Sequence, residues 1–178
     1  MTAGVGIAAA LLVLSALQAG DARSAAPRPC RAAELVLQLG PQVGEATGQH
    51  SLTLRLVDLS RSPCSLDGYP RVLLLDATGA LPFAITHHGD QMVTSRPPRR
   101  LVVEPARAAF VLLNHYRCDR GVVRTALVVR LGLPGSRATM SLPLADPYDR
   151  PTFCGPGDPG STLAVSPFEP TLRATLHR

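Results

Sequence analysis

Short apolar segments alternate with turns along most of this chain. Between His50 and Leu59, leucines at 52, 54 and 56 alternate with Thr53 and Arg55, which is the two-residue period of a half-buried strand. The run Val72 to Leu75 is continuously apolar and predicts a strand buried on both faces. An Asp-Ala-Thr-Gly turn, 76–79, then leads to Leu81–Ile85, so residues 72–85 predict a hairpin. Further strand-like segments cover residues 35–39, 99–103, 107–113, 122–131, 138–144 and 161–168.

These segments predict an all-β fold. About nine short runs, with turn signals every eight to twelve residues, are typical of a β-sandwich. Residues 106–113 have a composition that also suits a helix, but their bounding turns and β-branched neighbours favour a strand. The C-terminal tail, residues 169–178, carries one potential helical turn and is expected to be loose.

The N-terminus has the layout of a secretory signal peptide. Residues 5–17 are apolar or small, and Ala22-Arg23-Ser24 offers a cleavage site. We therefore expect a signal helix within residues 1–24 and a short linker at 25–29, and no transmembrane span after cleavage. An uncleaved membrane anchor is the alternative, although the run is short for a span. Cys30 follows Arg28-Pro29, which does not resemble a lipoprotein acylation site.

Four isolated cysteines follow this leader: Cys30, Cys64, Cys118 and Cys154. An even number of cysteines in an exported chain, with no C-x-x-C pair, predicts two disulfides. Three pairings exist, and sequence does not fix the connectivity. Loops of similar length favour Cys30 with Cys64 and Cys118 with Cys154.

Chain length and net charge further limit the class of protein. The 178 residues, 46% of them apolar, suit a leader and one domain, which we place at residues 30–168. The basic side chains are 18 arginines without a lysine, and the net charge is +5. A GC-rich genome would produce the same arginine usage. The charge favours non-specific association with anionic envelope polymers or lipid, and says nothing about fold.

Three histidines form the sharpest candidate for chemistry. His87 and His88 precede Gly89-Asp90, and His115 could meet them in space as a zinc or copper site. Adjacent residues of an extended chain point to opposite faces, so both imidazoles chelate one ion only if the backbone turns there. The competing interpretation is a pair of solvated loop histidines.

Three arginines form a second candidate. Arg96, Arg99 and Arg100 surround two prolines and could bind an anionic ligand; the alternative is a solvated edge protected by charge and proline. No aromatic residues are interleaved here, which argues against nucleic acid as a partner. The sequence has no G-x-S-x-G element or phosphate-binding glycine loop, so we expect neither an enzyme nor a cofactor.

The element Pro63-Cys-Ser-Leu-Asp-Gly-Tyr-Pro70, followed by an apolar strand and the turn at 76–79, resembles an actinobacterial secreted family, the domain of unknown function 4232. The similarity covers residues 30–168, and Asp58 departs from that family's usual asparagine. It also includes Cys30 with Glu34-Leu35, residues 56–60, Glu104-Pro105-Ala106, Asn114, Cys118, Cys154 and residues 163–168.

The resemblance implies an immunoglobulin-like, antiparallel β-sandwich that is exported, and it brings no known activity. The sequence therefore predicts a non-enzymatic binding or structural module of the cell envelope or the extracellular space. Its partner would be an anionic envelope polymer or another envelope protein. The alternative function is extracellular binding of copper or zinc by the histidine cluster.

Overall fold

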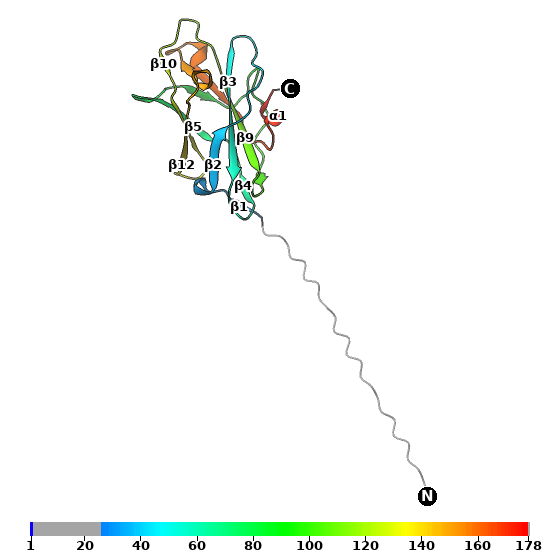
Figure 1. Cartoon of the computed structure of the whole chain (residues 1–178). Helices are drawn as coiled ribbons and strands as arrows, with labels where there is room; N and C mark the ends of the chain where they lie inside the picture. The colour runs from blue at the N-terminus through cyan, green and yellow to red at the C-terminus, as the bar shows by residue number, and fades with distance from the viewer. Residues whose placement is uncertain (2–25, 178) are drawn as a thin grey trace.

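The computed structural model describes Met1 and residues 26–177, and β-strands in four sheets make up most of its regular structure (Figure 1). The predicted signal helix lies outside the described residues, apart from Met1. No helix of the described part is long and apolar enough to span a bilayer.

The largest sheet has five strands. Their order is β2 (Leu35–Leu39), β3 (Gln49–Asp58), β9 (Ala108–Tyr116), β14 (Thr162–Val165) and β7 (Ala84–Thr86). The second sheet has the order β12 (Thr139–Pro143), β11 (Val128–Gly132), β5 (Arg71–Asp76) and β6 (Gly79–Ala80).

Two smaller sheets and four short helical segments complete the described structure. The three-stranded sheet joins β1 (Arg28–Pro29), β4 (Cys64–Leu66) and β8 (Leu101–Val103), and the two-stranded sheet pairs β10 (Arg124–Thr125) with β13 (Thr152–Phe153). The helical segments are η1 (Ala32–Glu34), η2 (Pro147–Asp149), η3 (Pro159–Ser161) and α1 (Leu172–Thr175).

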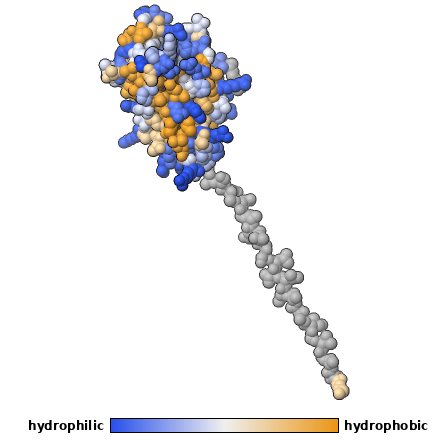
Figure 2. All heavy atoms as spheres, in the orientation of Figure 1, coloured by the Kyte–Doolittle hydropathy of each residue, from blue (hydrophilic) through white to orange (hydrophobic). Residues whose placement is uncertain are grey.

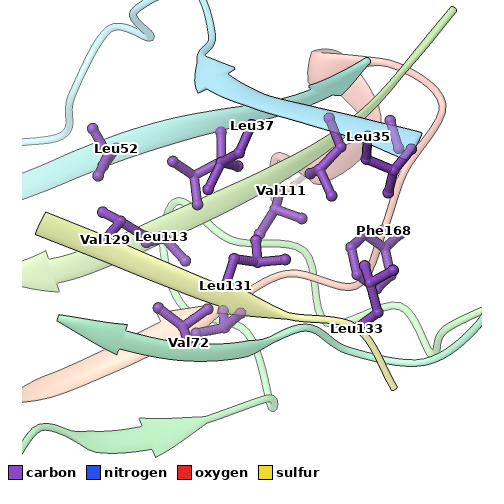
Figure 3. Packing of buried hydrophobic residues seen from close by; sticks show 14 of the residues in the cluster. Leu35, Leu37, Leu52, Val72, Val111, Leu113, Val129, Leu131, Leu133 and Phe168 are labelled. Carbon is purple, nitrogen blue, oxygen red and sulfur yellow. The ribbon is translucent and has the colours of Figure 1, made fainter. Parts of the chain in front are cut away.

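The two larger sheets share one core. Figure 3 shows side chains of β2, β3 and β9, such as Leu37 and Leu113, pointing toward Val72, Val129 and Leu131 of β5 and β11. Leu52, Leu54 and Leu56 of β3 are buried in this core as predicted, whereas Thr53, predicted on the polar face, is buried too. Apolar burial of this kind supplies most of the free energy that favours folding.

The strand at 71–76 is buried on one face only, which corrects the prediction of a fully buried strand. Val72 and Leu74 point into the core, whereas 48% of Leu73 is exposed. The outer face of the four-stranded sheet is therefore exposed to solvent at Leu73. Because leucine occupies both faces of β5, the sequence does not show the alternation between buried and exposed positions.

The hairpin prediction is correct only for its first part. β5 turns into β6 with Leu75 opposite Ala80 and Asp76 opposite Gly79. Pro82 has no N–H to donate to a ladder, and the chain leaves this sheet to form β7, which pairs in parallel with β14 of the other sheet. β1 also pairs in parallel with β4, so the sheets are not all antiparallel.

Both ends of the described chain pack against the domain. Arg28–Pro29, expected in a linker, form β1, and the Pro27 carbonyl accepts a hydrogen bond from Ser65 Oγ at 3.2 Å. The tail is not loose, which corrects a further expectation: Thr175 is fully buried, and Leu176 forms a β-bridge with Val93. Helix α1 thereby covers part of the outer face of β9.

Two disulfides join Cys30 to Cys64 and Cys118 to Cys154, the two pairs that similar loop lengths favoured. The first ties the start of the domain to β4. The second ties the loop after β9 to the segment after β13. Disulfides are typical of proteins in oxidising, extracellular environments.

Candidate functional site

A groove of about 750 Å³ opens on the outer face of the five-stranded sheet, away from the shared core. Arg55 of β3 and Phe110 of β9, which lie opposite each other in the ladder, line it together. Leu39 at the end of β2, Val102 of β8 and Pro170 of the tail also contribute to its lining.

Two guanidinium groups give the groove its charge. Arg55 and Arg107 both line it, and the ion pairs and hydrogen bonds of residues 26–177 involve neither side chain. Glu104 is the one acidic residue among the described lining residues. A guanidinium has five N–H donors in a planar fork that matches carboxylate or phosphate oxygens, so the groove offers donors to an anion.

Apolar surface surrounds these charges. Leu39 and Val102 are 36% and 41% exposed, and Phe110 is partly exposed. The described surface as a whole mixes apolar and hydrophilic residues: on the side that Figure 1 turns to the viewer, Figure 2 shows apolar residues gathered in a band. Exposed apolar patches bordered by polar residues are typical of interaction sites.

A strained turn holds Arg107 at the groove. Ala106 has a positive φ of 61°, a conformation that is costly for any residue with a Cβ atom. Its N–H donates to the Asp58 carbonyl at 2.8 Å, and the Asp58 N–H donates to the Arg107 carbonyl at 2.9 Å. These two hydrogen bonds fix the turn to the end of β3.

The three arginines predicted to form an anionic-ligand patch have different surroundings. Burial raises the pKa of Glu169, and the charges of Arg96 and Arg99 both act to lower it. Arg96 donates to the Ala174 carbonyl and lies 3.9 Å from a Glu169 carboxylate oxygen. Arg100 instead donates to the Pro27 carbonyl at 2.6 Å and to Ser65 Oγ at 3.1 Å. Arg96 therefore holds the C-terminal helix and Arg100 holds the segment before β1, whereas Arg55 and Arg107 line the groove.

The predicted metal ligands are not brought together. The His87 ring stacks on Tyr69, with centroids 4.0 Å apart, and burial followed by the charge of His88 lowers the pKa of His87. His115 is buried in β9, where it contacts His50 and Phe83 instead. Within residues 26–177, no group of three or more histidine, cysteine, aspartate or glutamate side chains could hold a metal ion.

His115 is the most strongly perturbed histidine. Its Nδ1–H donates to the Tyr116 carbonyl at 2.7 Å, and its Nε2 is buried without a hydrogen-bond partner in the described structure. Burial first, and the neighbouring His50 second, lower the pKa of His115 to about 4. The imidazole is therefore neutral at pH 7 and belongs to the core.

A buried polar network lies on the opposite face of β9. The Asn114 side-chain amide donates to Asp90 Oδ2 at 2.7 Å and to Gln49 Oε1, and its oxygen accepts from Ser51 Oγ at 2.7 Å. Asp90 Oδ1 accepts the N–H groups of Met92 and Val93. This network fastens the loop before Met92 to the sheet and has a structural role.

Arg55 and Arg107 were not identified as site residues from the sequence. The alternation placed Arg55 on the polar face of its strand, but the neighbouring sequence did not indicate that β8 and the tail would line a groove next to it. Arg107 follows the turn at Glu104-Pro105-Ala106, whose sequence is typical of a connection between two strands. Both arginines become groove residues through tertiary contacts, which the local sequence does not indicate.

Comparison with known proteins adds one match. A family model described as a domain of unknown function, DUF4232, matches residues 30–169. Neither the curated proteins nor the solved structures contain a match.

Proposed function

The chain belongs to the DUF4232 family of domains of unknown function, and from this and the groove we propose that it is an exported, non-enzymatic module that binds an anionic ligand of the cell envelope. The ligand lies across Arg55 and Arg107. The fold is an immunoglobulin-like sandwich that serves as a rigid support for this surface.

The case for export combines the leader and the disulfides. Residues 1–24 have the composition of a signal peptide, and all four cysteines are oxidised in pairs. The N-terminal part of the domain, which follows the leader, is fixed to β4 by Cys30–Cys64.

The observation that carries the binding role is the absence of an acidic partner for Arg55 and Arg107 within the described structure. Both guanidiniums lie beside apolar surface, where a charge-assisted hydrogen bond to an incoming anion is stronger than in open water. The lining offers charge and apolar contact, and this combination suits recognition of a ligand more than proton transfer to one.

Calorimetric titration with inorganic polyphosphate, a simple polyanion, tests this proposal. Wild-type protein should bind the polymer, and the affinity should fall as salt screens the charges. The double variant Arg55→Gln/Arg107→Gln should bind at least about tenfold more weakly, because two charge-assisted contacts are lost.

The matched control is the double variant Arg130→Gln/Arg137→Gln, which also removes two positive charges. Arg130 lies in β11, on the outer face of the other sheet, and both arginines are exposed and outside the lining of the groove. It should leave the affinity nearly unchanged. Equal losses in the control and in Arg55→Gln/Arg107→Gln would refute a groove site and leave only diffuse attraction to a basic protein.

A further inference from the structure

The strand β8 beside the groove has an unpaired edge. β4 is the only strand that pairs with it in the described sheets, so its other edge is open. An open edge presents backbone N–H and C=O groups that can pair with an additional strand.

The register identifies which backbone groups of β8 are free. The Ser65 carbonyl of β4 accepts the Cys30 N–H at 2.9 Å, so the peptide groups of Ser65 point toward β1 and away from β8. Ser65 lies opposite Val102. Directly opposite residues of an antiparallel pair either exchange both hydrogen bonds or exchange none, so the N–H and C=O of Val102 point away from β4.

The free edge and the charged floor belong to one groove. Val102, Arg55 and Arg107 all line it, together with Ala108 at the start of β9. An extended peptide could pair its backbone with Val102 while its side chains, which alternate between two faces, reach the arginines from one face.

We propose that the ligand of this groove is an extended acidic polypeptide that adds a strand at Val102 and places its carboxylates on Arg55 and Arg107. This inference rests on the proposed function. It is preferred to a sugar or phosphate polymer because only a polypeptide uses both the backbone edge and the guanidiniums.

Fluorescence anisotropy with a labelled eight-residue peptide of alternating valine and glutamate tests the inference. The peptide should bind wild-type protein, and replacing its glutamates with lysine should abolish binding. N-methylation of the backbone at alternate residues, which removes N–H donors while keeping the charges, should weaken binding at least about tenfold if pairing at β8 occurs.

A protein variant provides a second, independent readout. Val102→Pro removes the free N–H of β8 and should weaken the peptide at least about tenfold while leaving polyphosphate binding unchanged. Val102→Ala shortens the same side chain but keeps the N–H of β8, and as the matched control it should bind the peptide nearly as wild type does. Because N-methylation is tested on wild-type protein, the inference stays falsifiable even if the proline variant misfolds.

The outcomes separate the two proposals. If polyphosphate binds through the arginines but the acidic peptide does not, or N-methylation has no effect, the polypeptide inference is wrong and the anionic-ligand function stands. If neither probe binds, or Arg55→Gln/Arg107→Gln has no effect on either, both proposals fail.

Discussion

Protonation of His115 is expected to destabilise the fold as the pH falls. The unfolded chain binds a proton on this imidazole near pH 6.5, whereas burial and His50 delay protonation in the folded state to about pH 4. Between these two values the unfolded state carries more protons, so stability decreases as the pH decreases. Above pH 6.5 both states are neutral at this position, and the penalty is absent.

The structure sets the size of this effect. Each pH unit between 6.5 and about 4 costs about 1.4 kcal/mol of unfolding free energy, so the total loss is about 3 kcal/mol. The physical cause is burial of the ring, followed by the charge of His50, which together outweigh the backbone groups of Tyr116 and Gly160 that favour the protonated ring. Burial also lowers the pKa of His50, which adds to the loss in the same direction.

Urea unfolding followed by circular dichroism at pH 7, 6, 5 and 4.5 measures the effect. His115→Phe keeps an aromatic ring against Phe83 and removes the titration, so its unfolding free energy should fall less steeply with decreasing pH than that of wild type. Leu74→Ala, which lowers stability without removing a titrating group, is the control and should keep the wild-type slope. Equal slopes in wild type and His115→Phe would refute the reasoning.

Three further changes are expected to alter stability, each measured by urea unfolding at pH 7. Replacing Cys118 and Cys154 with serine should cost about 4 kcal/mol, because the bridge spans 36 residues; an unchanged midpoint would contradict this. Leu74→Ala should cost about 3 kcal/mol, while Leu73→Ala next to it should cost less than about 1 kcal/mol, and similar losses would mean that both side chains are buried. Asn114→Ala should cost about 2 kcal/mol by leaving Asp90 and Gln49 short of a hydrogen bond, and a neutral result would show the network is dispensable.

The alternation of apolar and polar residues predicted the strands that have one solvent-exposed face and one buried face. In β3 the alternation identified the three buried leucines correctly, because each residue's face follows from its position, but it did not show that Thr53 on the opposite face is buried as well. In β5 the pattern was uninformative, since leucine occupies both faces and only the absence of a covering layer decides that Leu73 is exposed. The sequence predicted the turn at 76–79, but it did not predict that the chain crosses to the other sheet after Pro82.

The candidate site depended on contacts that no local pattern encodes. The arginines at 96 and 100 stand out in the sequence, yet they donate hydrogen bonds to the carbonyl groups of Ala174 and Pro27. The histidines at 87 and 115 were grouped by residue type, but the fold places one on Tyr69 and the other in the core. Arg55 became a site residue only because β8 and Pro170 lie beside it.

The most direct test of the anion-binding groove is to locate bound anion on the folded protein. Amide resonances of ¹⁵N-labelled protein would be followed by NMR while inorganic polyphosphate is added. Chemical-shift changes should be concentrated at Arg55, Arg107 and Phe110, and Arg130 should be unaffected. Shifts spread over all exposed arginines, or centred on the outer face of the four-stranded sheet, would contradict an anion-binding site in the groove.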